Sequence, residues 1–224
     1  MATFVLVPGS FEGSWTFAEL ERELADRGHS TVTLTLPGLE SDFDIDREIP
    51  PNLDDHISAV VDAIPEGADL ILAAHSYGGM TLPGVYERLP DRFAGVVFID
   101  AFLPGQGDSC WTLLTDALRE TFVSQISADG RYLRPLPGSD HRSSDHPVAS
   151  LMQPSRVGST FSGARKIYLF ANQWAGSPFR GTFAALEKSA EWETYELTAD
   201  HGLIRNQAEL VAEVLDQLTA AVVG

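Results

Sequence analysis

The stretch that decides the fold is Ala74-His75-Ser76-Tyr77-Gly78, which stands between an apolar run ending at residue 73 and a predicted helix at residues 79–89. A strand that turns sharply into a helix holds the residue at its apex in strained backbone geometry and exposes its side chain. Strand and helix approach each other closely at such a turn, so the positions two before and two after the apex must be small. Ala74 and Gly78 meet this requirement, and Ser76 is therefore a candidate nucleophile.

Short apolar strands alternate with helices along most of the chain. The predicted strands are 3–7, 30–36, 70–74, 95–99, 166–170 and 193–197, and the predicted helices are 15–27, 53–64, 79–89, 179–188 and 207–221. Continuous apolar strands between helices indicate a sheet that is covered on both faces. The pattern therefore predicts one α/β domain over residues 1–224 with a mostly parallel sheet.

Residues 102–164 interrupt this alternation. They contain several Pro-Gly and Asp-Gly turns, a polar segment at 139–146 and one predicted amphipathic helix at 111–125. A plain connection of about 60 residues would be unusually long. An insertion at the carboxyl edge of a sheet is where a cap over an active site would lie, so we expect a cap here; the alternative is an ordinary surface excursion.

Composition narrows the class of protein. The formal net charge of −17 argues against nucleic acid and against anionic membrane surfaces as partners, and leaves a small-molecule substrate. The single cysteine, Cys110, cannot form an intrachain disulfide, and no signal peptide or membrane span is recognisable. We expect a cytoplasmic monomer or homodimer. The six histidines form no spaced metal-binding cluster and no phosphate-binding glycine loop is present, so no metal or cofactor is predicted.

Several separated segments carry a resemblance that spans nearly the whole chain. They are Phe4–Val7 with Gly9 and Gly13-Ser14-Trp15, Gly28-His29, Leu36-Pro37-Gly38, His75–Gly79, Val97–Pro104, Met152-Gln153-Pro154 and Asp200-His201. In this order they resemble the branch of the α/β-hydrolases that contains plant methylesterases, hydroxynitrile lyases and bacterial EstC-like esterases. The resemblance implies the α/β-hydrolase fold, whereas function varies within the branch and does not follow from the fold.

The resemblance also implies roles for individual residues. His201, in the loop after the last strand, matches the base that takes the proton from Ser76. An oxyanion hole needs two backbone N–H donors, and the matching positions are Tyr77 and Ser10. Pro8 stands where the relatives carry histidine; it removes an N–H at residue 8 but not at residue 10.

The acid that should orient His201 is displaced from its usual position. In this branch it follows the next-to-last strand, but Trp174 occupies that place. Asp100 is the best substitute because it ends the strand that follows the nucleophile helix. The run Gly95–Ala101 resembles the haloalkane dehalogenases that place their acid there. In other relatives an aspartate at this position only caps or hydrogen-bonds locally, so both interpretations stay open.

The leading hypothesis is a serine hydrolase that cleaves a small carboxylic ester, lactone or thioester through an acyl-enzyme. The candidate substrate-binding residues are Gly9, Phe11, Phe102, Trp111 and Trp174, and the aromatic ones favour an apolar acyl or alcohol part. One alternative is non-hydrolytic chemistry, such as the lyase reaction of some relatives. The other is a binding protein on a degenerate hydrolase scaffold, which the missing acid at residue 174 would favour. The sequence does not identify the natural substrate or the mobility of the cap.

Overall fold

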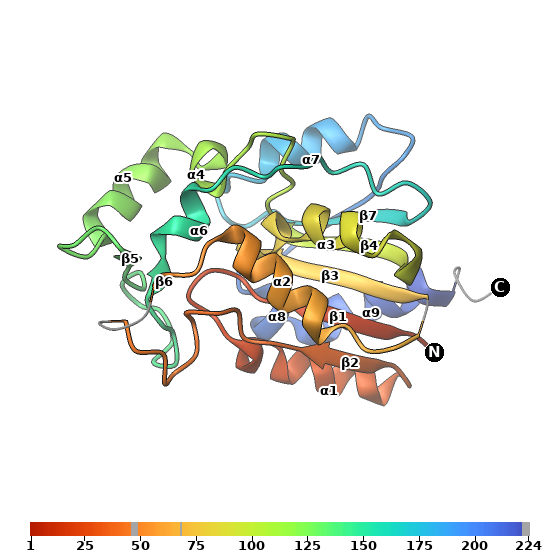
Figure 1. Cartoon of the computed structure of the whole chain (residues 1–224). Helices are drawn as coiled ribbons and strands as arrows, with labels where there is room; N and C mark the ends of the chain where they lie inside the picture. The colour runs from red at the N-terminus through yellow and green to blue at the C-terminus, as the bar shows by residue number, and fades with distance from the viewer. Residues whose placement is uncertain (46–48, 68, 221–224) are drawn as a thin grey trace.

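The computed structural model describes residues 1–45, 49–67 and 69–220. A central sheet of six strands runs through the molecule, with helices on both faces (Figure 1). The strands are β1 (Thr3–Val7), β2 (Ser30–Thr33), β3 (Leu70–Ser76), β4 (Phe93–Ala101), β7 (Arg165–Ala171) and β8 (Glu193–Leu197). Their order across the sheet is β2-β1-β3-β4-β7-β8, and every neighbouring pair is parallel. The α/β-hydrolase fold expected from the sequence is confirmed.

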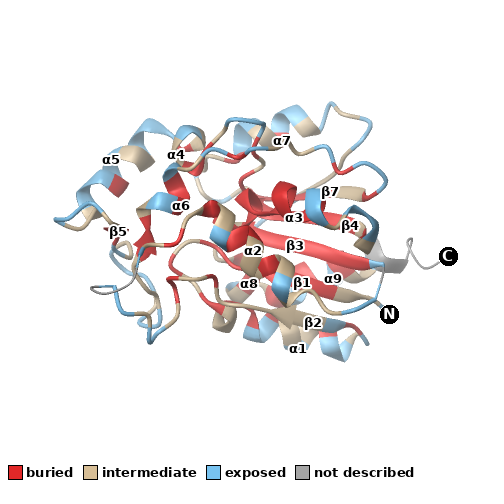
Figure 2. Ribbon diagram, in the orientation of Figure 1, coloured by how far each residue is buried: buried red, intermediate tan, exposed pale blue. Residues whose placement is uncertain are grey.

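Each face of the sheet has its own apolar core, because successive side chains of a strand point to opposite sides. Val5 and Val7 belong to the cluster that packs against α2 (Leu53–Ala63), α3 (Leu82–Arg88) and α7 (Arg180–Leu186). Phe4 and Leu6 belong to the cluster that packs against α1 (Ala18–Asp26), α8 (Leu203–Asn206) and α9 (Ala208–Ala220). Figure 2 shows the central strand β3 buried, the edge strand β2 intermediate and the outer faces of the helices exposed. These two cores explain why the central strands, such as β3 and β4, read as nearly continuous apolar runs.

The chain order places a crevice at the carboxyl edge of the sheet. The chain runs from β1 to β2 on one side, and then crosses to β3 on the other side of β1. At the point where the strand order reverses, the loops after two neighbouring strands run in opposite directions. The crevice between these loops is the usual ligand site of a parallel sheet. The loop after β1 contains Ser10, and β3 ends at Ser76, so both predicted residues lie at this point.

Residues 102–164 leave the sheet after β4 and return to it at β7. They contain α4 (Cys110–Leu113), α5 (Asp116–Gln125), the short hairpin of β5 (Tyr132–Leu133) and β6 (His146–Pro147), and α6 (Val148–Met152). Figure 1 shows these elements beyond the end of the sheet that lies opposite the N terminus. The single helix predicted at 111–125 is two helices, because Ser109 and Thr115 each cap a new helix with the side-chain oxygen.

The other helices also differ in part from their predicted bounds. The helix after Ser76 divides into the 3₁₀ turn η2 (Tyr77–Met80) and α3, so Pro83 lies in the first turn of α3, where no backbone hydrogen bond is lost. The chain also forms the 3₁₀ turns η1 (Ser14–Phe17) before α1 and η3 (Pro90–Arg92) before β4. The predicted last helix, 207–221, corresponds to α9, and α8 is a separate short helix before it; the predicted final residue, 221, lies outside the described residues. No described helix has the length and apolarity of a membrane span.

Candidate active site

Ser76 stands at a strained turn between β3 and η2. Its backbone has φ 53° and ψ −123°, a conformation that a residue with a side chain adopts only where the surrounding structure enforces it. The close approach that the sequence predicted is visible at Gly78. A Cβ atom there would lie 2.6 Å from the carbonyl oxygen of Val7 and 2.7 Å from that of Pro8. Both obstacles are backbone atoms of the β1 end, so only glycine fits.

Ser76, His201 and Asp100 form one continuous line of hydrogen bonds. Ser76 Oγ lies 3.0 Å from His201 Nε2, and His201 Nδ1 lies 2.6 Å from Asp100 Oδ2. The three residues come from the end of β3, the loop after β8 and the end of β4. The structure therefore brings together the three residues that the sequence nominated, although they are more than a hundred positions apart at the extremes.

A β-bulge aims Asp100 at the imidazole. His75 pairs with Ile99 and Ser76 pairs with Ala101, which leaves Asp100 as an extra residue on β4. Its φ of 43° is that of a bulged, left-handed residue, a conformation that aspartate tolerates better than most. The bulge also explains the packing: Ile99 and Ala101, two positions apart, belong to the cores on opposite faces of the sheet.

The hydrogen bonds of Asp100 fix the proton positions around His201. Asp100 is fully buried, and its Oδ1 accepts the amide N–H of Ala171 at 3.1 Å. An ionised carboxylate can only accept, so Nδ1 of His201 carries the proton and Nε2 is free to accept from Ser76 Oγ. Burial lowers the pKa of His201 below its usual 6.5, although the hydrogen bond to Asp100 opposes the shift. The ring is therefore neutral near pH 7, the form that a general base requires.

The two predicted oxyanion donors lie on either side of the serine turn. Tyr77 is the first residue of η2, and the first N–H groups of a helix have no acceptor within it. Ser10 lies in the loop after β1 and lines the same cavity as Ser76. Its neighbour Gly9 lies very close to Ser76. A Cβ atom at residue 9 would be only 2.9 Å from Cβ of Ser76, so a larger residue would not fit there without a shift.

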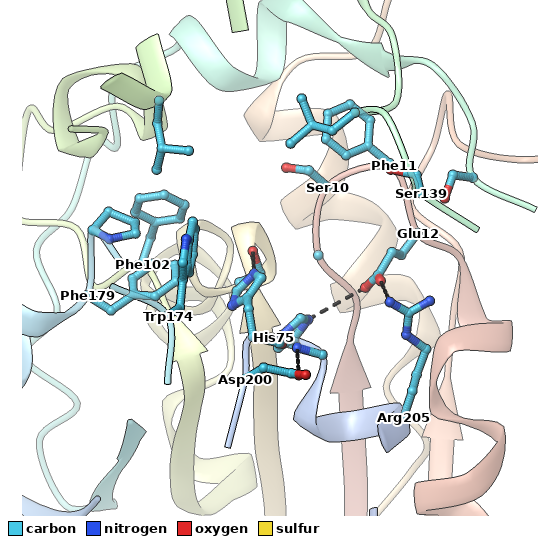
Figure 3. Close-up of a pocket in the computed structure, with 18 of the residues that line it drawn as sticks. Ser10, Phe11, Glu12, His75, Phe102, Ser139, Trp174, Phe179, Asp200 and Arg205 are labelled. Carbon is cyan, nitrogen blue, oxygen red and sulfur yellow. Dashed lines mark hydrogen bonds and ion pairs between the residues drawn. The ribbon is translucent and has the colours of Figure 1, made fainter. Parts of the chain in front are cut away.

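A cavity of about 530 Å³ opens above Ser76 and His201. Gly9, Phe11, Phe102 and Trp174 line it, as the sequence analysis expected for substrate-binding residues. Trp111 is not among the lining residues; it is half-buried and packs against the apolar core instead. Figure 3 shows Phe102, Trp174 and Phe179 on one side of the cavity, and Ser10, Phe11 and Ser139 on the other.

Further apolar side chains come from the 102–164 segment and from the loop before α7. They are Cys110, Leu114, Leu118, Phe122, Leu136, Pro178 and Phe179. Trp174, at the usual position of the acid, has its ring centre 4.9 Å from that of His201, and the ring centre of Phe179 lies 5.5 Å from it. The position that holds an acid in the relatives therefore supplies an aromatic wall here.

Sequence reasoning missed the part that His75 takes at this site. Side chains of neighbouring residues in a tight turn usually diverge, so the sequence alone does not place the side chain of His75 in the site. Its Nε2 instead donates to the carbonyl oxygen of His201 at 2.8 Å, and the two ring centres are 4.6 Å apart. Glu12 and Arg205 also line the cavity and were not singled out. The only signal in the sequence was the proximity of each residue to a motif.

Two other histidines form a buried network under Tyr77, outside the cavity. His56 Nδ1 lies 2.9 Å from the Tyr77 hydroxyl, and His56 Nε2 donates to the carbonyl of Pro37. His146 Nε2 lies 2.9 Å from the Ser150 hydroxyl. Burial lowers the pKa of His56 to about 4 and also lowers that of His146. Both rings are therefore neutral, and they join α2 and the 102–164 segment to the nucleophile turn.

The sequence profile of the alpha/beta hydrolase family matches residues 4–222, and the chain belongs to this family. It is similar to a carbendazim-hydrolysing esterase of Nocardioides sp. (strain SG-4G), with 27% identity over 97% of this chain and all of that protein. It is also similar to Methylesterase 1 of Arabidopsis thaliana, with 30% identity over 45% of this chain and 40% of the plant protein.

Solved structures with a similar fold cover nearly the whole chain. An extracellular α/β-hydrolase from a Paenibacillus species, described as a structural and functional homologue of tobacco salicylic acid binding protein 2, superposes with a TM-score of 0.82. It has 23% identity over 97% of this chain and 98% of that one. A pyrethroid hydrolase from Sphingobium faniae has a TM-score of 0.80 and 17% identity, over 98% of each chain. At these identities the likeness establishes the fold.

Proposed function

We propose that this protein is a serine hydrolase that cleaves a small carboxylic ester through an acyl-enzyme. The observation that carries the proposal is the line of hydrogen bonds from Ser76 through His201 to Asp100, at 3.0 Å and 2.6 Å, beside the cavity. The relatives named above are esterases and hydrolases, which favours hydrolysis over the lyase chemistry of other members of the branch.

The reaction follows from the proton positions. Ser76 Oγ attacks the ester carbonyl carbon while its proton passes to Nε2 of His201. Asp100 stabilises the imidazolium, and the amides of Ser10 and Tyr77 hold the negative oxygen of the tetrahedral intermediate. The imidazolium then protonates the departing alkoxide, which leaves as the alcohol. Water then attacks the acyl-enzyme while His201 takes one of its protons. The second tetrahedral intermediate collapses as His201 returns that proton to Ser76 Oγ, and the carboxylic acid that is released ionises in water.

The cavity favours an apolar ester of modest size. Its walls are mostly aromatic and aliphatic, and Trp174 and Phe179 lie directly against the base. A volume of about 530 Å³ is in the lower half of the usual range for ligand pockets. We further propose that residues 102–164 act as a cap, since they supply Phe122, Leu114 and Leu118 to this wall.

The test is covalent labelling with a fluorophosphonate, followed by identification of the modified peptide. Ser76 should be the labelled residue, and Ser76→Ala should lose both the label and the hydrolysis of p-nitrophenyl butyrate. A burst of p-nitrophenol equal to the enzyme concentration would mark the acyl-enzyme. If the folded protein takes no label and hydrolyses no aryl ester, the proposal is wrong.

A further inference from the structure

A second carboxylate and imidazole pair stands behind His201. Glu12 Oε2, from the loop after β1, lies 3.5 Å from Nδ1 of His75, the residue before the nucleophile. Only 13% of the Glu12 side chain and 3% of the His75 side chain are exposed. Neither of these two buried atoms has a closer hydrogen-bond partner among the described residues. Burying two polar atoms without polar partners costs free energy, so we expect these two atoms to interact with each other.

His75 transmits this contact to His201. A carbonyl oxygen can only accept, so Nε2 of His75 carries a proton and donates it to the carbonyl oxygen of His201 at 2.8 Å. Nδ1 is then the atom that faces Glu12, and a proton on it turns the pair into an ion pair. The His75 ring also lies against the His201 ring, with centres 4.6 Å apart and planes tilted by 33°. His75 thus contacts both the backbone and the ring of the proposed base.

Arg205 holds the other side of Glu12. Its guanidinium lies 3.5 Å from Glu12 Oε1 and 3.8 Å from Oδ2 of Asp140, which belongs to the 102–164 segment. Figure 3 shows Glu12 between His75 and Arg205. Burial acts to raise the pKa of Glu12, but the close contact with His75 and the positive charge of Arg205 outweigh it. The pKa is lowered overall, and Glu12 is an anion at neutral pH.

We propose that Glu12 is a positioning residue of the active site: through His75 it fixes the backbone and ring of His201, and its charge supports the imidazolium formed during turnover. The inference rests on the proposed function, because it takes His201 as the base. Glu12, in the loop after β1, would then be a second carboxylate that supports His201, in addition to Asp100 at the end of β4. A displacement of the base by about 1 Å can slow a reaction about a hundredfold.

The charged groups that face His201 determine the sign of the pH effect. Asp100 on β4 and Glu12 after β1 favour the imidazolium, whereas a positive charge on His75 of β3 would oppose it. Asp200 bonds within its own loop to Gly202, and Arg205 and Asp140 stand behind Glu12. Removing the charge of Glu12 takes away one of the two anions that favour the imidazolium. The acidic limb of kcat/KM should then move to lower pH.

The experiment compares Glu12→Gln with Glu209→Gln, a matched change at an exposed position of α9. Glu12→Gln should lower kcat by about tenfold to a hundredfold while KM changes less than about threefold, the pattern of a misplaced base. Its acidic limb should lie below that of the wild type, and Glu12→Asp should restore part of kcat. If kcat and the pH limb of Glu12→Gln equal those of Glu209→Gln, the positioning role is refuted.

Two further measurements separate this inference from the proposed function. If the wild type hydrolyses no ester, the proposed function fails. NMR titration of His201 in the wild type and in Glu12→Gln then decides the positioning role: a lower midpoint in the variant supports it, and an unchanged midpoint overturns it. If Glu12→Gln does not fold, His75→Gln replaces it, since glutamine keeps a donor for the His201 carbonyl but loses the ion pair. A wild-type kcat in that variant would overturn the proposal.

Discussion

Replacing Asp100 by asparagine should nearly abolish turnover without unfolding the protein. Oδ1 of Asp100 accepts the Ala171 amide at 3.1 Å, and Oδ2 accepts from His201 Nδ1 at 2.6 Å. Asparagine has only one acceptor oxygen. If that oxygen keeps the amide of Ala171, the new NH₂ group faces Nδ1 and forces the proton of His201 onto Nε2. Ser76 then has no acceptor for its proton.

The opposite orientation of asparagine is no better. It would turn the NH₂ group toward the N–H of Ala171, which places two donors against each other at a fully buried position. The wrong tautomer of His201 is therefore the favoured outcome. Such a change reduces kcat by about 10⁴ in a serine protease, which corresponds to about 5 kcal/mol of transition-state stabilisation. We expect a loss of about 10³ to 10⁴ here.

The assay is kcat/KM for an aryl ester, together with thermal unfolding. Asp69→Asn is a matched control: Asp69 also has positive φ, at 60°, but it is exposed and precedes β3 at the other end of the strand. Asparagine tolerates positive φ, so neither substitution strains the backbone. The control should keep wild-type activity. A loss of less than about tenfold in folded Asp100→Asn would show that the aspartate is not the acid.

Three further predictions concern pH and packing. Since burial lowers the pKa of His201, kcat/KM should fall on the acidic side with a midpoint below 6.5, and a midpoint above 6.5 in the pH–rate profile would contradict this. His56 has a pKa of about 4 when folded against 6.5 when unfolded, so the unfolded chain binds more protons between these values and stability falls as pH falls. Urea titrations at pH 7 and pH 5 should show a loss of about 2 kcal/mol from this group, and His56→Gln should remove that part; an unchanged pH dependence in the variant would refute it. Gly78→Ala should destabilise the fold by about 3 kcal/mol or more, because the new methyl group meets two backbone oxygens at 2.6 and 2.7 Å. Unchanged thermal unfolding would mean that the turn relaxes.

The sequence was enough to predict the sheet and the two ends of the proposed proton relay. Apolar runs such as residues 70–74 are unambiguous because each buries both faces. Ser76 and His201 carry local motifs, and the fold brings the loops after β3 and β8 to the same edge. The role of Asp100 stayed open between two interpretations. The reason is physical: a bulge adds one residue to a strand, and in a strand buried on both faces the apolar pattern does not reveal the extra position.

The contacts of Glu12, His75 and Arg205 could not be predicted from the chain. Each joins a different loop or element, and no spacing along the sequence relates a loop after β1 to a helix after β8. The break in the helix predicted at 111–125 was readable in principle, because Ser109 and Thr115 are both good capping residues. The amphipathic pattern of residues 111–125 continues across the break between α4 and α5, and for this reason it predicted one helix.

The bulge in β4 has a consequence for how this protein can change. With a carboxylate delivered to the imidazole by β4, the loop that follows β7 carries no charge that the proposed chemistry depends on. Trp174 stands in that loop against the imidazole and forms part of the wall that meets the substrate. Selection, or an engineer, can therefore exchange this side chain to admit another ester while the proton-transfer apparatus stays intact. Substrate preference would then depend on the loop after β7, and proton transfer on the carboxylate at the end of β4.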